Sequence, residues 1–148
     1  SCVVLAGGEP KLEVTKNGGK GGRNLFMGLR ALKMKMVDEN SVFIPLASDG
    51  MDNSDSAGVV IDKNTLEKVE KLGIDMDDYL DRFDAYSVFE KSGDIIMTGP
   101  TGANVSDLMI LLKTNDILVL THSVKSVKFV FLVLSIRDDR FVVLGSSA

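Results

Sequence analysis

The sequence predicts a three-layer α/β domain in which a mixed β-sheet is covered by helices. Two observations point to this fold class. Short apolar runs typical of strands alternate with helical periodicity between residues 1 and 112, and a strand–turn–strand pattern within residues 2–15 adds antiparallel pairing to the sheet. With 148 residues, of which 45% are hydrophobic and 26% charged, the chain can bury one core and is expected to be a single soluble domain.

The first predicted strand covers residues 2–6, a continuous apolar run that ends at Gly7 and Gly8. A run without alternating polar residues is typical of a strand that is covered on both faces. Residues 12–15 are expected to return as the second strand of a hairpin, with Pro10 in the turn.

A helix and a strand are expected next. Apolar residues recur at i, i+4, i+7 and i+11 within residues 25–36, which predicts an amphipathic helix with a core-facing stripe. The stripe consists of Leu25, Leu29, Leu32 and Met36. Residues 41–47 predict a strand, in which Pro45 indicates an edge position or a local irregularity.

Mainly helical segments follow. Residues 57–61 are expected to form a short helix that is capped by Ser54 or Asp55. Apolar spacing, capping residues and terminal glycines predict three further helices, and two more apolar runs predict strands. The helices are expected at residues 65–72, 74–83 and 84–90, and the strands at residues 95–98 and 108–112.

Charge and cysteine content exclude several classes of partner. The net charge of −4 and the pI near 5.0 argue against nucleic acid as the partner, because the sequence has no basic stripe to neutralise phosphates. No apolar run reaches the length of a membrane span, and no signal peptide is recognisable. Cys2 is the single cysteine and cannot form an internal disulfide. We therefore expect a cytoplasmic protein that binds neither nucleic acid nor membranes.

Residues 18–24 read Gly-Gly-Lys-Gly-Gly-Arg-Asn and directly precede the first predicted helix. Such a loop presents backbone N–H groups at the positive end of a helix dipole, which favours an anion. Arg23 could clamp a carboxylate or phosphate while Asn24 fixes its orientation. Lys20 is followed by Gly21 rather than Ser or Thr, so the loop is not a Walker A motif. A flexible glycine turn with a solvated arginine fits the composition equally well.

Residues 48–56 carry three aspartates after the predicted strand 41–47. In α/β domains, chemistry is commonly placed at the carboxyl ends of strands. Asp49 stands first after the strand, where the sheet determines its position. A calcium loop needs acidic residues at i, i+2 and i+4, whereas Asp49 and Asp52 are three apart. We therefore predict no metal site in this loop.

Several short motifs occur along the chain in a set order. They are Ala6-Gly7-Gly8-Glu9-Pro10, Gly21-Gly22-Arg23-Asn24, Ser48-Asp49-Gly50-Met51-Asp52, Ala57-Gly58, and Thr98-Gly99-Pro100-Thr101-Gly102-Ala103-Asn104-Val105-Ser106-Asp107. With this order and spacing, residues 1–113 resemble the MOFRL domain, the carboxyl-terminal half of class II glycerate kinases, some of which are labelled hydroxypyruvate reductases. Residues 114–148 form a β-prone tail without a recognised counterpart.

The resemblance implies an active site shared between two domains. In this family, an amino-terminal Rossmann-like domain and the MOFRL domain enclose a cleft where ATP and Mg²⁺ phosphorylate the 2-hydroxyl of D-glycerate. By motif, Arg23 and Asp49 are implied as catalytic residues. Arg23 would hold the glycerate carboxylate or the transferring phosphoryl group, and Asp49 would orient the attacking hydroxyl or accept its proton. The implied substrate-binding residues are Glu9, Lys20, Gly22, Asn24 and Asn104.

The sequence also departs from the family. The usual Gln-Glu pair after Gly-Gly-Arg-Asn is Leu25-Phe26 here, and the loop after Asp52 has lost its usual Gly-Pro-Thr. The amino-terminal domain is absent from the sequence, so the chain by itself is expected to be half an active site and inactive. Two alternatives stay open. One is a non-catalytic anion-binding or interaction module, and the other is a hydroxypyruvate reductase, for which no dinucleotide fingerprint occurs.

Overall fold

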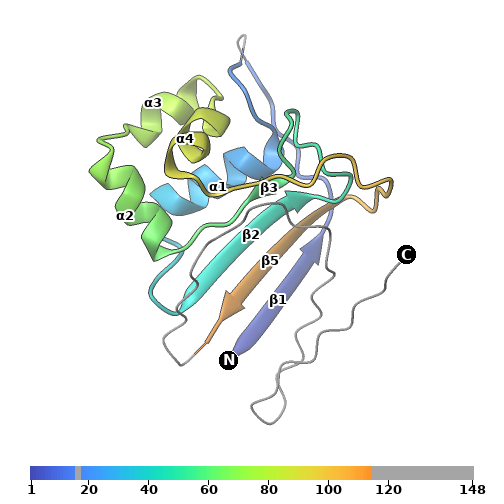
Figure 1. Ribbon diagram of the computed structural model, residues 1–148, viewed down its shortest axis with the longest axis horizontal. Helices are drawn as coiled ribbons and strands as arrows, with labels where there is room; N and C mark the ends of the chain where they lie inside the picture. Colours follow the sequence, from blue (N-terminus) through green and yellow to red (C-terminus); the bar gives the residue numbers. More distant parts are fainter. Residues whose placement is uncertain (16–17, 115–148) are drawn as a thin grey trace.

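The computed structural model describes residues 1–15 and 18–114, which form a five-stranded sheet and four helices (Figure 1). The strands are β1 (Cys2–Gly7), β2 (Ser41–Ala47), β3 (Gly58–Val59), β4 (Ile95–Ile96) and β5 (Asp107–Lys113). The helices are α1 (Arg23–Lys33), α2 (Lys63–Lys71), α3 (Met76–Asp81) and α4 (Ala85–Ser92). This confirms the predicted α/β class. Beyond Thr114, the predicted β-prone tail lies outside the described residues.

The strand order in the sheet is β1-β5-β2-β3-β4. In the described part of the chain, each pair of neighbouring strands is antiparallel. The last strand, β5, lies between β1 and β2, so these two strands run in the same direction without pairing with each other. Consequently β1 and β2 end at the same edge of the sheet where β5 begins.

The predicted hairpin between residues 2–6 and residues 12–15 is wrong. β1 pairs along its length with β5, from Cys2 opposite Lys113 to Gly7 opposite Leu108. Residues 9–15 form no strand. The turn residues at Gly7–Pro10 are a local signal. They could not reveal that β1 forms its hydrogen bonds with β5, a strand about a hundred residues later in the chain.

Helix α1 packs closely on β2 and β3. Leu25, Leu29 and Leu32 are completely buried, as the periodicity predicts, and Val59 of β3 is completely buried against them. A Cβ atom at Gly28 would lie 2.5 Å from the Val59 Cγ1 atom, so the glycine permits this close approach. Met36, the fourth member of the predicted stripe, is 60% exposed because α1 ends at Lys33.

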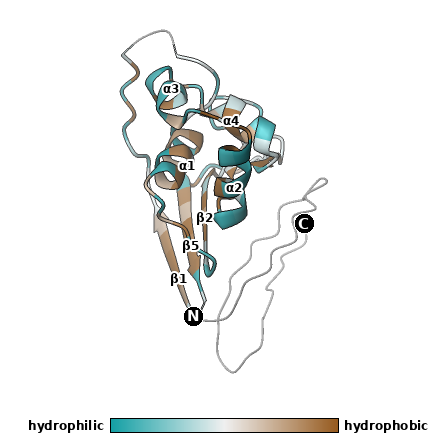
Figure 2. Ribbon diagram, turned by 90° about the vertical axis from the view of Figure 1, so that its left-hand side faces the viewer, coloured by the Kyte–Doolittle hydropathy of each residue, from teal (hydrophilic) through white to brown (hydrophobic). Residues whose placement is uncertain are grey.

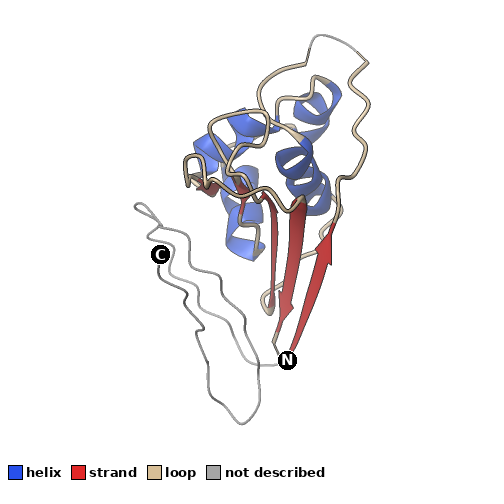
Figure 3. Cartoon of the chain, turned by 90° about the vertical axis from the view of Figure 1, so that its right-hand side faces the viewer, coloured by secondary structure: helices blue, strands red, loops and turns tan. Residues whose placement is uncertain are grey.

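The helices leave the β1 edge of the sheet uncovered. They gather over β2, β3 and β4, and Figures 2 and 3 show them on one side of the sheet. On β1, the side chains of Val4 and Leu5 are 53% and 66% exposed. The expectation that residues 2–6 are covered on both faces is therefore wrong for the described part of the chain. That part has one helical layer, whereas the expected three-layer arrangement requires two.

Pro45 lies in a central strand, so the edge position inferred from it is wrong, whereas the alternative of a local irregularity is confirmed. On the β3 side of β2, Phe43 N–H donates to the Ile61 carbonyl at 2.9 Å and Ala47 N–H donates to the Ala57 carbonyl at 2.7 Å. The backbone nitrogen of Pro45, midway between these two residues, points towards β3 as well, but proline has no N–H to donate. The ladder is interrupted there, and β3 spans only Gly58–Val59.

Residues 57–61 form β3 and its extension rather than the predicted helix, because Ala57, Val59 and Ile61 all turn into the core with no exposed surface. Neither Ser54 nor Asp55 is therefore a helix cap. The following helix, α2, is capped by Asp62, whose Oδ1 accepts from the Thr65 N–H at 2.8 Å. Apart from residues 12–15, the other predicted helices and strands are present; β2 has the predicted ends, and the ends of the others differ by a few residues.

Asp38 ties the start of β2 to the end of β5. Its carboxylate accepts hydrogen bonds from the Ser41 hydroxyl at 2.7 Å, from Lys113 Nζ at 3.0 Å and from the Asn40 N–H at 3.0 Å. These bonds, led by that of Ser41, lower the pKa of Asp38 from 3.8 to about 2. Because the pKa is lowered in the folded state, the stabilisation is present above pH 3.8 and is lost as the pH falls towards 2.

We therefore expect Asp38→Asn to destabilise the protein at neutral pH and to have a much smaller effect at the pKa of about 2, where half of the parent carboxyl is protonated and most of the stabilisation is lost. Urea unfolding of both proteins at the two pH values measures the difference. An equal loss at both pH values would show that the charge of Asp38 has no part in the stabilisation.

Candidate active site

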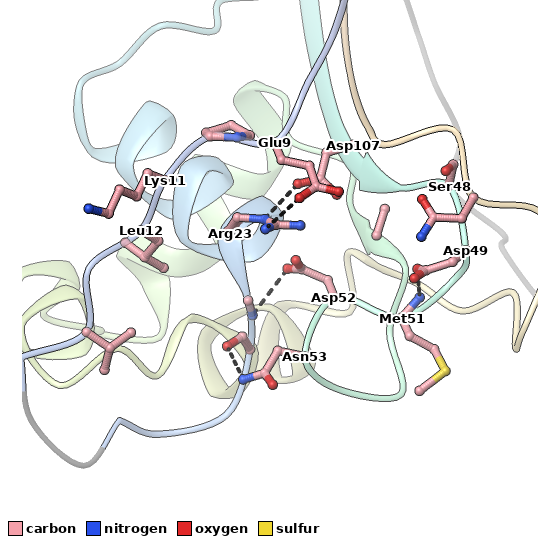
Figure 4. Close-up of a pocket in the computed structure, with 16 residues that line it drawn as sticks. Glu9, Lys11, Leu12, Arg23, Ser48, Asp49, Met51, Asp52, Asn53 and Asp107 are labelled. Carbon is pink, nitrogen blue, oxygen red and sulfur yellow. Dashed lines mark hydrogen bonds and ion pairs between the residues drawn. The ribbon is translucent and has the colours of Figure 1, made fainter.

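A cavity of about 560 Å³ opens at the edge of the sheet where β1 and β2 end and where β5 and α1 begin (Figure 4). It brings together Glu9 after β1, Arg23 at the start of α1, Asp49 after β2, and Asn104 before β5. The four residues come from four of the motifs that carry the family resemblance, and they line one concave surface. The register that places Asp107 opposite Ala47 and Leu108 opposite Gly7 is what brings the loops together.

The amino terminus of α1 already holds an anion, and this anion is the side chain of Asp52. Its carboxylate accepts from the backbone N–H groups of Gly22, Asn24 and Leu25 at 3.2, 3.1 and 2.7 Å. The Asn24 side-chain amide donates to Asp52 Oδ1 at 3.1 Å. The glycine loop therefore does present its amides to a negative charge, as predicted, but the charge belongs to the protein itself.

Burial raises the pKa of Asp52, while the hydrogen bonds from Leu25 and Asn24 act in the opposite direction. The contact between Asp52 and the start of α1 also explains why residue 22 is a glycine. A Cβ atom at Gly22 would lie 2.4 Å from Asp52 Oδ1, so a larger residue would push the carboxylate away from the helix. Sequence reasoning treated Asp52 as one of several loop aspartates and missed this function. The available signal was a carboxylate in a recognised motif that had no other assigned role.

Arg23 lies between two carboxylates. Its Nε–H donates to Asp107 Oδ2 at 2.9 Å, and its Nη1 lies 3.5 Å from Glu9 Oε2. The two acidic partners differ, because the Asp107 side chain is 4% exposed and that of Glu9 is 57% exposed. Arg23 is itself partly exposed on the cavity wall. Asp107 was recognised only as a motif position, and nothing in its sequence context pointed to a contact with Arg23.

Asp49 and Asn104 belong to two loops that are bonded to each other. The Asp49 carbonyl accepts from the Thr101 N–H at 3.0 Å, and the Thr101 hydroxyl donates to the Ser48 carbonyl at 2.6 Å. The Asp49 Oδ1 atom accepts from the Met51 N–H at 3.0 Å, and Asn104 Oδ1 accepts from the N–H two residues later at 3.1 Å. Both side chains thus hold their own turns while lining the cavity.

Lys20 and Asn24 do not line the cavity. Lys20 pairs with Asp55 at 2.7 Å and lies 3.5 Å from the centre of the Tyr86 ring. The hydrogen bond to Asp55 is the main cause that raises the pKa of Lys20. Asn24 is completely buried and bonded to Asp52. Of the residues implied as substrate-binding, the structure brings Glu9, Gly22 and Asn104 together, whereas Lys20 and Asn24 support the loop that carries Arg23.

The charge of the cavity wall is mixed. Its cationic residues are Lys11 and Arg23, and its acidic residues are Glu9, Asp49, Asp52 and Asp107. Within residues 1–15 and 18–114, no group of three or more His, Cys, Asp and Glu side chains is arranged to hold a metal ion. Among the same residues, no helix is long and apolar enough to cross a membrane.

Comparison with known proteins points to one family. The chain is 34% identical to glycerate 2-kinase of Pyrococcus horikoshii over 76% of its length, and 37% identical to D-glycerate 2-kinase of Thermotoga maritima over 74%. It covers 26% of the length of each of these relatives. It also superposes on the crystal structure of a Thermotoga maritima glycerate kinase with a TM-score of 0.69 and 36% identity, covering 76% of this chain and 27% of that one.

The sequence profile of the MOFRL family matches residues 2–107. This region contains Glu9, Arg23, Asp49 and Asn104, the four motif residues that meet at the cavity. The match thus spans most of the described sheet and helices as well as the candidate site. The chain therefore belongs to the MOFRL family.

Proposed function

We propose that this chain supplies substrate- and phosphate-binding loops to the active site of an ATP-dependent glycerate 2-kinase. The observation that carries the proposal is the convergence of Glu9, Arg23, Asp49 and Asn104 on one cavity from four separate segments of the chain. The relatives named glycerate 2-kinase support the choice of reaction. Because the chain covers about a quarter of their length, an amino-terminal Rossmann-like domain is the proposed second half of the site. We also place the full-length enzyme in the cytoplasm.

Arg23 and Asp49 are the proposed catalytic residues. Phosphoryl transfer depends mainly on positioning and on neutralising charge, both of which a guanidinium supplies. Arg23 would hold the glycerate carboxylate or the transferring phosphoryl group. Asp49 uses Oδ1 to accept from the Met51 N–H, and its second carboxylate oxygen would orient the 2-hydroxyl of D-glycerate or accept its proton.

Glu9, Gly22 and Asn104 are the proposed contacts to D-glycerate. Glu9 can accept hydrogen bonds from the substrate hydroxyls, and Asn104 can donate or accept through its amide. Gly22 lies beside Arg23 on the cavity wall, where Asp52 takes the space that a side chain would fill, so its proposed contact is through the backbone. All three residues line the cavity. Lys20 and Asn24 are assigned the indirect task of holding the loop.

ATP is the proposed phosphoryl donor, with Mg²⁺ as its counter-ion. The amides at the start of α1 are bonded to Asp52, so a phosphate contact from this chain would come from Arg23. Magnesium in such sites is usually held by phosphate oxygens and water together with one or two carboxylates. Bound magnesium would neutralise charge on the phosphates.

We expect the full-length protein to release ADP from ATP in the presence of D-glycerate and Mg²⁺, and residues 1–148 alone to release none. The reason is that this chain supplies one wall of a site completed by a second domain. A coupled ADP-release assay measures both, with glycerate omitted as the control for ATP hydrolysis. If the full-length protein binds D-glycerate without turnover, it is a binding module instead of a kinase.

A further inference from the structure

We propose that Asp107 is a positioning residue that sets the direction of the Arg23 guanidinium, an inference that rests on the proposed kinase function. The Arg23 Nε–H donates to Asp107 Oδ2 at 2.9 Å. The Asp107 side chain is 4% exposed, whereas the Arg23 side chain is 39% exposed. A buried carboxylate therefore holds the guanidinium at Nε, on the side nearest the helix, while the group itself remains accessible from the cavity.

Arg23 needs such a support because its direction matters. A guanidinium binds a carboxylate or phosphate through two parallel N–H bonds, so its plane has to face the ligand. With Nε bonded to Asp107, the terminal nitrogens are the atoms that remain for a ligand. One of them, Nη1, lies 3.5 Å from the exposed carboxylate of Glu9. An entering anion would thus meet Arg23 end-on, beside or in place of Glu9.

Asp107 connects Arg23 with other segments of the cavity wall. It is the first residue of β5, and it lies opposite Ala47, two residues before Asp49. Its carbonyl accepts from the Gly8 N–H at 3.0 Å, one residue before Glu9. One buried residue therefore contacts three of the segments that form the cavity wall. Asp107 would act on the reaction through Arg23, without touching the substrate.

A double-mutant cycle in the full-length enzyme tests this role. Asp107→Asn keeps the size of the side chain and removes the charge that holds Nε. We expect it to lower kcat/KM for D-glycerate at least about tenfold in the parent background, a size common for coupled neighbours. In the Arg23→Ala background, the same change should alter kcat/KM less than about twofold, because Asp107 then has no guanidinium to direct.

Asp94→Asn is the matched control. Asp94 is also a buried aspartate, and its Oδ1 accepts from Lys68 Nζ at 2.6 Å, but it does not line the cavity. This variant should lower the melting temperature and leave kcat/KM unchanged in both backgrounds. If Asp107→Asn behaves like Asp94→Asn, or if it reduces kcat/KM equally with and without Arg23, the positioning role is refuted.

The NMR signal of the Arg23 Nε–H provides a readout that does not depend on turnover. The signal is identified by its loss in Arg23→Lys. In the parent protein it should be shifted and protected from solvent exchange, and in Asp107→Asn it should move to the position of solvated arginines. An unchanged signal would overturn the inference. If the parent instead shows no glycerate-dependent ADP release, the proposed function has failed, and the NMR result still decides whether Asp107 orients Arg23.

Discussion

Arg23→Ala in the full-length protein should lower kcat/KM for D-glycerate by about a hundredfold or more. Removing one preorganised donor from a transition-state site costs on the order of 2.7–4 kcal/mol, and Arg23 is the cation that the fold presents at the centre of the motif residues. The Arg23 side chain is 39% exposed, but its removal leaves the buried Asp107 carboxylate without this donor, so the kinetics are measured on variants that urea unfolding shows to be folded. Steady-state kinetics at saturating ATP with varied D-glycerate measures it.

Two further variants test whether the loss is specific to the guanidinium of Arg23. Arg23→Lys should recover only part of the activity, because an ammonium keeps the charge and loses the planar fork. Arg30 is an exposed arginine near the other end of the same helix, so Arg30→Ala is the matched control and should be as active as the parent. Turnover by Arg23→Ala at the parental rate would mean that the glycine loop and its arginine are purely structural.

Asp52→Ala should lower the free energy of unfolding by about 3 kcal/mol, the scale expected when buried N–H groups lose their acceptor and a helix loses its cap. The carboxylate accepts from three backbone N–H groups at the start of α1 and from the Asn24 side chain. It is 4% exposed, so water cannot readily replace it. Urea unfolding of the full-length protein measures the loss.

Two control variants distinguish the loss of the helix cap from the loss of a negative charge in the loop. Asp55 belongs to the same loop but forms an exposed ion pair with Lys20, so Asp55→Ala should change the stability far less. Asp52→Asn keeps one oxygen acceptor and should fall between the parent and Asp52→Ala. If Asp52→Ala is as stable as Asp55→Ala, the amides of α1 find other partners and Asp52 is not the cap.

Local patterns predicted much of the secondary structure. The periodicity of Leu25, Leu29 and Leu32 identified α1, because the helix buries these side chains at the spacing at which they recur. The apolar run at residues 41–47 matches β2 at both ends. The β-branched segment at residues 57–61 was misassigned because a short buried run does not distinguish a strand from a helix.

The candidate site was predicted in part, for a different reason. The motifs named Glu9, Arg23, Asp49 and Asn104 correctly as residues that meet, because the family resemblance carries information about spatial proximity that no single segment contains. The same motifs also named Lys20 and Asn24, which the structure places in the support of the glycine loop. Contacts of these side chains depend on which neighbours fold against the loop, and adjacent residues can face opposite directions.

By itself, the sequence determined the α/β class and most of the elements, since periodicity is a local property of a chain, and its resemblance to a family named motif residues that line the cavity. The tertiary structure alone decided that β5 inserts between β1 and β2, that Asp52 occupies the start of α1, and that Asp107 holds Arg23. The hydrogen bonds in these three features join residues at least 27 positions apart, and Arg23 and Asp107 are separated by 84. Such contacts form only when the whole sheet sets the register, so no local pattern could predict them.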